Sequence, residues 1–370
     1  MKLYNIAQIG TFDVENYGDL LFPNMFYNEM SKRIALREHT LFSPIGGAKP
    51  FETNVEVFPM SDLEKKINFF HYDAIVVGGG DIIRNDTEYF RSLWLAKEMG
   101  QRYRIPVIWN CVGVPFSFNG SEDRKNIQDY CNQLVYLSVR DMNAQNKLIH
   151  AGVKNINVVP DSIINLNRLY RKDTLQKRFL ELGRIGAVPA IKDYIALQAS
   201  PGIFHRENDY EELINTIKNI LEKTRLNVVL LSICHCHNDL LLLQKIKSSF
   251  PERVFLINQK LNTKDIASVI ASSRFFIGTS LHGNITAYSY GVKHLALNIA
   301  NISKIDGFFD LIHQQEACIH KMKDVENMFF KQIIATEDED KHYEKRKSQL
   351  AQQIDIHFNN IANIIVKGKK

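Results

Sequence analysis

The sequence predicts an α/β protein with two parallel-sheet domains, and three observations lead to this prediction. The chain has 370 residues, which is more than one ordinary hydrophobic core contains. Short apolar runs alternate with helical patterns along its length, as in parallel α/β proteins. This alternation occurs in two successive halves. We therefore expect two Rossmann-like domains that face each other across a cleft, followed by a C-terminal helix.

The first domain is predicted over residues 1–165. Its strands are expected at 3–9, 74–77, 107–111, 135–139 and 157–159, and its helices at 19–33, 87–100, 122–131 and 142–151. Residues 166–190 contain Gly183, Gly186 and Pro189 and no clean strand pattern. Because glycine and proline interrupt regular structure, this stretch is expected to be a boundary that links the two domains and contains some helix.

The second domain is predicted over residues 191–335. Its strands are expected at 194–198, 227–232, 254–257, 275–277 and 294–297, and its helices at 210–223, 239–248, 265–272 and 283–291. Residues 336–370 are expected to form the C-terminal helix and a basic tail. Ligands of such sheets bind at the carboxyl ends of the strands, so polar motifs at those positions are candidate site residues.

The composition of the chain indicates the charge of its ligand and the cellular compartment in which it works. The net charge of +5 suits an anionic small ligand and is too mild to indicate nucleic acid. Five cysteines without framework spacing favour a reducing compartment, and no apolar run approaches the roughly 20 residues that span a bilayer. We expect a cytoplasmic protein, with peripheral contact at the inner face of the membrane as the alternative for the basic tail.

The sequence Thr279-Ser280-Leu281-His282-Gly283 follows an apolar strand and precedes a helical pattern. A turn of this kind points backbone N–H groups and the positive end of a helix dipole at an anion. His282 is a candidate proton donor or anion ligand, with Ser280 and Gly283 beside it. In the alternative, Ser280 only caps the helix and His282 is a surface loop residue.

A polar loop with Asn16, Gly18 and Asp19 follows the first strand. Asn16 and Asp19 are expected to face the cleft, where Asp19 would be a base or a ligand of an acceptor hydroxyl. The alternative for Asp19 is a helix N-cap.

Three glycines end the strand at 74–77 and are followed by Asp81 and Arg84. Gly79 and Gly80 would let the backbone approach a ligand closely, and Asp81 and Arg84 would reach it. The spacing does not match the dinucleotide-binding pattern, and a tight crossover turn is the alternative.

Basic side chains follow two further strands. Arg140 is expected to project into the cleft, where its planar fork suits a carboxylate or phosphate; a structural ion pair with Asp141 or another group is the alternative. Arg206 follows the strand at 194–198 and is a further candidate. The run 234–237 alternates Cys and His, but its spacing is wrong for structural zinc, so no metal is expected.

Taken in order, these motifs resemble the polysaccharide pyruvyl transferase family over about residues 4 to 300. The resemblance implies a fold similar to that of the GT-B glycosyltransferases. It also implies transfer of the enolpyruvyl group of phosphoenolpyruvate to a sugar, closure to a pyruvate ketal and release of phosphate. The family's histidine falls on His282, its strand-end arginine on Arg140, and its Asn-x-Gly-Asp motif on Asn16, Gly18 and Asp19.

The sequence departs from the family pattern at one position. Some members carry an arginine two places before the histidine, where this chain has Ser280. Arg84, Arg206 or Lys293 would then have to neutralise the phosphate.

Mechanistic expectations follow from the resemblance. His282 would bind phosphate and act as general acid, Arg140 would bind the carboxylate or phosphate, and Asp19 would orient or deprotonate the acceptor hydroxyl. The acceptor would be a sugar on a lipid-linked oligosaccharide, and the scheme requires no metal and no cofactor. The alternatives are a GT-B glycosyltransferase that uses a nucleotide sugar and a non-catalytic carbohydrate-binding protein.

Overall fold

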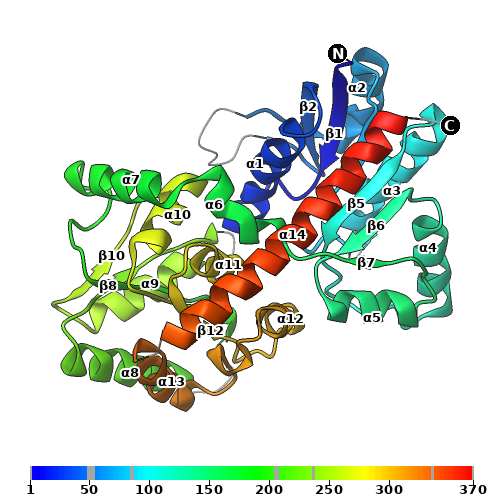
Figure 1. Ribbon diagram of the computed structural model, residues 1–370. Coiled ribbons are helices and arrows are strands. Elements are labelled where there is room, and N and C mark those ends of the chain that lie inside the picture. The colour runs from blue at the N-terminus through cyan, green and yellow to red at the C-terminus, as the bar shows by residue number, and fades with distance from the viewer. Residues whose placement is uncertain are drawn as a thin grey trace. The chain divides into compact units, whose positions relative to one another are not determined.

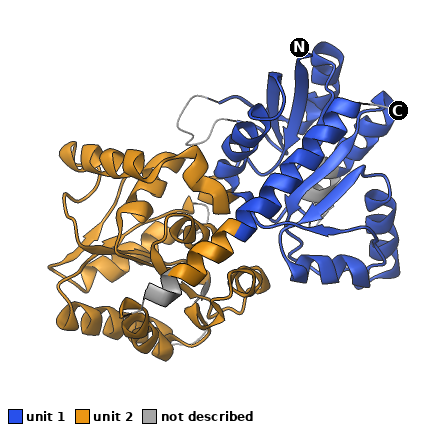
Figure 2. Ribbon diagram, in the orientation of Figure 1, with its two compact units in different colours: residues 1–14, 19–162, 349–370 blue, residues 15–18, 163–348 orange. Residues whose placement is uncertain are grey.

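The computed structural model describes residues 2–47, 55–83, 87–203, 208–235, 238–334 and 337–368. The chain divides into two compact units, which Figure 2 shows in different colours. Unit 1 comprises Met1–Val14, Asp19–Ser162 and Gln349–Lys370, and unit 2 comprises Glu15–Gly18 and Ile163–Ser348. The short segment Glu15–Gly18 thus belongs with the second half of the sequence, which the sequence did not predict.

Unit 1 is built on a parallel sheet of seven strands within the described residues, in the order β3-β2-β1-β4-β5-β6-β7. The strands are β1 (Tyr4–Ile9), β2 (Leu36–Ser43), β3 (Val57–Pro59), β4 (Ala74–Val77), β5 (Val107–Val112), β6 (Tyr136–Val139) and β7 (Asn157–Val158). The sequence predicted five of these strands, and it did not predict β2 and β3.

Helices cover both faces of this sheet (Figure 1). One face carries α2 (Leu63–Phe70), α3 (Thr87–Tyr103), α4 (Ser121–Cys131) and α5 (Met142–His150). The other face carries α1 (Tyr17–Ser31) and the end of α14 (Glu337–Lys367), where the rings of Phe26 and Phe358 lie 6.2 Å apart. His357 on α14 also bonds to Asn110 on β5 at 2.7 Å.

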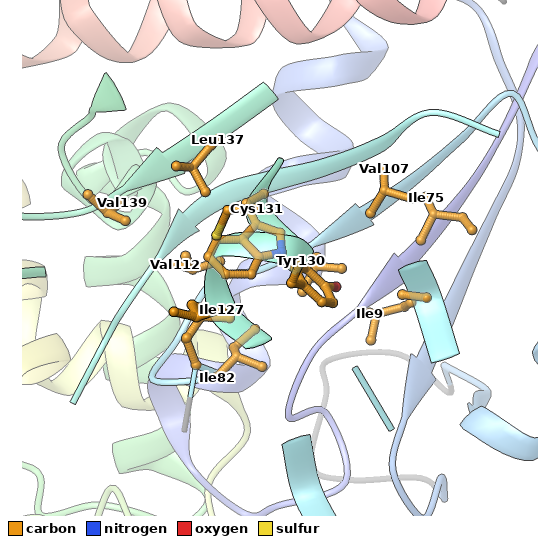
Figure 3. Close-up of a cluster of buried hydrophobic side chains, with 14 of the residues drawn as sticks. Ile9, Ile75, Ile82, Val107, Val112, Ile127, Tyr130, Cys131, Leu137 and Val139 are labelled. Atoms are coloured by element: carbon orange, nitrogen blue, oxygen red, sulfur yellow. The ribbon is translucent and has the colours of Figure 1, made fainter. Parts of the chain in front are cut away.

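The core on the first face is formed by apolar side chains from alternate strand positions and from α4 (Figure 3). Ile75, Val107 and Leu137 of three neighbouring strands pack with Ile127 and Tyr130 of α4. Because parallel strands are buried on both faces, this packing fixes the sheet and thereby the position of each strand end.

Unit 2 contains a parallel sheet of six strands in the described part of the chain, in the order β10-β9-β8-β11-β12-β13. The strands are β8 (Tyr194–Gln198), β9 (Asn227–Leu230), β10 (Val254–Leu256), β11 (Phe275–Gly278), β12 (Lys293–Leu297) and β13 (Cys318–Ile319). The helices are α6 (Leu166–Leu169), α7 (Lys172–Arg184), α8 (Asp209–Lys223), α9 (Asp239–Ser248), α10 (Thr263–Ser272), α11 (Leu281–Ser289), α12 (Ser303–Ile312) and α13 (Val325–Ile333).

The stretch 166–190, which was expected to link the domains, contains α6 and α7 and belongs to unit 2. Helix α7 buries Leu175, Phe179 and Leu182, and Phe179 stacks on Tyr194 of β8 with ring centroids 5.3 Å apart. The buried residues recur at helical spacing, so the apolar stripe of α7 places the helix on the sheet.

Helix α14 contributes to both units, with residues up to Ser348 in unit 2 and residues from Gln349 in unit 1. Its first part is held in unit 2, where Tyr343 donates to the carbonyl of Tyr288 and Lys347 donates to the carbonyl of Ser289 at 2.6 Å. Within the described residues no helix, α14 included, has the combination of length and apolar character needed to cross a membrane.

Buried histidines predict that the fold loses stability in mild acid. Burial lowers the pKa of His294 in unit 2 to about 4 and, together with the Arg33 charge, that of His357 in unit 1 to about 3. Below the usual histidine pKa near 6.5 the unfolded chain takes up these protons and the folded chain does not. Unfolding free energy should therefore fall as pH drops from about 6.5 toward 4, by about 1.4 kcal/mol per pH unit for each histidine.

Urea unfolding at pH 7.5 and pH 5 tests this prediction. The matched variant His294→Gln removes one titrating group and should be less sensitive to pH than the wild type over the same interval. An unchanged pH dependence in that variant would exclude His294 as a source of the acid sensitivity.

Candidate functional site

Two groups of polar residues lie at the carboxyl ends of parallel strands, one group in each unit. The group in unit 2 follows β11 and includes His282. The group in unit 1 follows β4 and β6 and includes Asp81 and Arg140. The expectation that the motifs follow strands is therefore correct for both groups.

The turn between β11 and α11 is braced by side chains of its own residues. Ser280 Oγ accepts from the Gly283 N–H at 3.2 Å, which makes Ser280 the N-cap of α11. Asn284 Nδ2 donates to the carbonyls of Gly278 at 3.1 Å and Ser280 at 2.9 Å. The capping role foreseen as the alternative for Ser280 is thus correct.

Gln198, at the end of β8, also holds this turn and was missed in the sequence. Its Oε1 accepts from the backbone N–H groups of Thr279 at 3.0 Å and Ser280 at 2.9 Å. Its Nε2 donates to Asp239 at 2.9 Å, and the side chain is 1% exposed. An amide that ends an otherwise apolar buried strand is the signal that could have identified it.

His282 lies in the first turn of α11 and is 8% exposed. The alternative of a surface loop residue is therefore wrong. Its imidazole packs directly against Gly18, where any Cβ would overlap the ring. Only glycine at position 18 permits this approach.

The segment Glu15–Gly18 is held beside His282 by bonds within unit 2. The Tyr17 N–H donates to the carbonyl of Ile233 at 3.0 Å, and the Tyr17 hydroxyl bonds to Thr286 Oγ1 at 2.9 Å. Asn16 Oδ1 accepts from the Gly18 N–H at 3.2 Å, so Asn16 shapes the turn. Through these contacts the Asn-x-Gly motif holds Gly18 against the His282 imidazole.

Asp19 is the third residue of α1 and not its N-cap, so the capping alternative is wrong. In unit 1 its carboxylate lies beside Gly80, which has φ +84°, and a Cβ there would be 2.6 Å from Asp19 Oδ1. Gly80 thus lets the loop after β4 approach the Asp19 carboxylate.

Arg140 is 4% exposed and lies among carboxylates of unit 1. Its guanidinium donates to Asp81, and its Nε is 3.8 Å from Asp141. Burial opposes the charge, but Asp81, Asp141, Asp161 and Asp19 outweigh it and raise the pKa of Arg140. The ion-pair alternative is therefore the arrangement that the structure shows, with Asp81 as the partner.

Loss of this buried cation should destabilise unit 1. Arg140→Met leaves the Asp81 and Asp141 carboxylates without their shared partner, so we expect a loss of about 3–5 kcal/mol in unfolding free energy. Urea titration at pH 7.5 measures it. The control Arg102→Met removes an exposed ion pair with Glu64 and should change stability little. If Arg140→Met lowers the unfolding free energy as little as Arg102→Met does, Arg140 is not important for the stability of unit 1.

Two other glycines serve packing. A Cβ on Gly79 would overlap the Phe22 ring, and a Cβ on Gly283 would lie 2.5 Å from Phe276 Cζ. In the structure both glycines therefore allow an aromatic ring to pack closely against the backbone.

Several residues predicted for the site lie outside the described residues or away from the two polar groups. Arg84 and Arg206 lie outside the described residues, as do Cys236 and His237. Lys293 begins β12, pairs in register with Phe275 at the start of β11, and donates to the carbonyl of Gln332 at 2.7 Å. Because parallel strands begin at the edge opposite to the His282 turn, the proposal that Lys293 neutralises phosphate there is wrong.

Solved structures share the fold. UDP-GlcNAc 2-epimerase from Neisseria meningitidis, bound to UDP-GlcNAc, has a TM-score of 0.58 at 15% identity, covering 99% of this chain and 99% of that chain. HepE from Anabaena, in complex with UDP and glucose, has a TM-score of 0.58 at 15% identity, covering 98% of this chain and 100% of that chain. At this identity the likeness shows the fold alone, and it confirms the predicted GT-B-like α/β class.

The sequence comparisons identify the family. No curated protein matches the chain. The family model described as polysaccharide pyruvyl transferase matches residues 9–301, which include both groups of site residues. The chain therefore belongs to the polysaccharide pyruvyl transferase family.

Proposed function

We propose that the protein transfers pyruvate from phosphoenolpyruvate to a sugar of a surface polysaccharide or its lipid-linked precursor. Two sugar hydroxyls form bonds to C2 of the donor, the methylene carbon gains a proton to become methyl, and inorganic phosphate leaves. The product is a pyruvate ketal. Family membership supports pyruvyl transfer to a polysaccharide. The observation that carries the proposal is the His282 imidazole, fixed against Gly18 in the first turn of α11.

His282 and the turn before α11 form the proposed donor site. A phosphate at this helix terminus is stabilised by the helix dipole and by backbone N–H groups. The Ser280 hydroxyl accepts from Gly283, so its proton can be donated to a phosphate oxygen. In protonated form His282 donates a proton to the methylene carbon and stabilises the leaving phosphate.

The carboxylates of unit 1 form the proposed acceptor site. Asp19 and Asp81 offer oxygens that accept hydrogen bonds from sugar hydroxyls, and the excess of carboxylates around Arg140 repels an anionic donor. We assign Asp19 as the base for the attacking hydroxyl and Arg140 as a positioning residue for Asp81. Asp19 directly follows Gly18 in the chain, so the proposed base and the backbone that holds His282 are covalently linked.

The test supplies phosphoenolpyruvate and a lipid-linked oligosaccharide fraction and measures phosphate release together with pyruvate bound to sugar. The wild type should release phosphate in step with ketal formation. Asp19→Asn should reduce both by about 10²-fold or more, because an amide cannot accept the hydroxyl proton. Asp173→Asn, at an exposed position paired with Arg171, is the control and should leave both unchanged.

Two outcomes would each overturn one part of the proposal. Full activity of Asp19→Asn would remove Asp19 as the base. Release of UDP from a UDP-sugar, without phosphate release from phosphoenolpyruvate, would replace pyruvyl transfer with glycosyl transfer.

A further inference from the structure

Beyond the proposed active site, one group of side chains in the described part of unit 2 combines three types of metal ligand. Asp306 of α12, Cys318 of β13 and His320 each offer a ligand atom, and these atoms all lie within 4.8 Å of one another. We propose that Asp306, Cys318 and His320 form a binding site for Zn²⁺. The family model ends at residue 301, so the three residues lie beyond the segment that it matches.

The distances suit a tetrahedral zinc ion. Asp306 Oδ1 lies 3.3 Å from Cys318 Sγ and 3.3 Å from His320 Nε2. With zinc at about 2.0–2.3 Å from each ligand atom, neighbouring ligands of a tetrahedron lie about 3.3–3.6 Å apart. The two spacings to Asp306 thus match a tetrahedral site, and the ligand atoms of Cys318 and His320 lie within 4.8 Å of each other.

The local fold explains why these side chains converge. Cys318 and His320 are two positions apart on and just after a strand, so they point to the same side. Asp306 lies one turn into α12, the helix that follows β12 and contacts β13. The cluster is thus at the carboxyl edge of the unit 2 sheet.

Neighbouring amides orient two of the ligands. His320 Nδ1 lies 2.9 Å from the amide oxygen of Asn301, to which it donates, so Nε2 is the ring nitrogen that would bind the metal. Asn298 Nδ2 donates to Asp306 Oδ1 at 2.8 Å. Second partners of this kind commonly fix the ring orientation and the tautomer of a metal-bound histidine.

The chemical types of the three ligands indicate which metal would bind, and the exposure of their side chains indicates whether water can reach it. A thiolate, an imidazole and a carboxylate suit Zn²⁺ and are unsuited to Mg²⁺ or Ca²⁺, which prefer oxygen. Cys318 is 7% exposed, whereas the side chains of His320 and Asp306 are 43% and 33% exposed. The open side gives water access to the fourth coordination position. On binding, the Cys318 thiol loses its proton to solvent and no redox step occurs.

Cobalt titration of the purified full-length protein, kept reduced with a phosphine, tests the site. Wild type should bind one equivalent of Co²⁺ with a near-ultraviolet thiolate-to-cobalt absorption band that Zn²⁺ abolishes. Cys318→Ser should lose the band. Asn301→Ala, which leaves all three ligands in place, should weaken binding about 10-fold or more. Cys131→Ser changes a buried cysteine of unit 1 and should retain the band.

The alternative is a simple Asp306–His320 ion pair with a thiol hydrogen bond. Absence of the band in wild type, or its persistence in Cys318→Ser, would overturn the zinc site. His320→Gln, at a half-exposed position, is the second variant in case Cys318→Ser does not fold, and metal affinity equal to that of wild type would also overturn the proposal. None of these measurements depends on pyruvyl transfer, so the two proposals fail separately.

Discussion

His282→Gln is expected to lower turnover with phosphoenolpyruvate by about 10²- to 10⁴-fold, the range that a positioned general acid contributes. Glutamine approximates the size of the imidazole and can donate a hydrogen bond, but it cannot deliver a proton. The loss should appear in kcat, because the proton is needed as the methylene carbon reacts. Phosphate release under saturating donor and acceptor measures it.

A second buried histidine provides the control for this prediction. His294 is 4% exposed on β12, next to the strand that leads to His282, and has no role in the proposed chemistry. At pH 7.5 His294→Gln should keep turnover near the wild-type value. Near-normal phosphate release by His282→Gln would show that another group supplies the proton.

Gly18→Ala should reduce turnover about 10²-fold or more although glycine has no functional group. The added methyl occupies the space of the His282 imidazole, and the ring must move because the Gly18 backbone is held by unit 2. A displacement of about 1 Å can cost about 10²-fold in rate. Steady-state phosphate release measures the effect, and circular dichroism verifies that the fold is retained.

Gly183→Ala is the matched glycine substitution. Its Cβ would meet Ala190 at an ordinary 3.5 Å, and it lies within α7, where alanine is the better helix former. This variant should be as active as wild type. Turnover of Gly18→Ala equal to that of Gly183→Ala would contradict the claim that Gly18 positions His282.

Strand prediction succeeded where the sequence pattern is strongest. The predicted bounds of β4 and β8 match the structure, because continuous apolar runs are typical of strands buried on both faces. β2 was missed because its first half, with Arg37, Glu38 and His39, lacks an apolar run and is partly exposed. β13, with two residues, is too short for any periodicity.

The candidate site was predictable as a set of strand-end motifs but not as a geometry. The sequence identified Gly18 and His282 separately, and only tertiary packing brings them together. It identified Arg140 as a cation at a strand end, but the surrounding carboxylates come from four separate places in the chain. The role proposed for Arg140 is therefore to position Asp81, in place of the anion binding expected from the sequence.

Thermal unfolding with phosphoenolpyruvate, in parallel with UDP and pyruvate, tests the central claim that the His282 turn binds this donor. A ligand at about 100 times its dissociation constant adds about 2.7 kcal/mol to stability, which raises the unfolding midpoint measurably. We expect a higher midpoint with phosphoenolpyruvate for wild type and His294→Gln, and a much smaller shift for His282→Gln. A rise with UDP and none with phosphoenolpyruvate, or an equal phosphoenolpyruvate shift in His282→Gln, would contradict it.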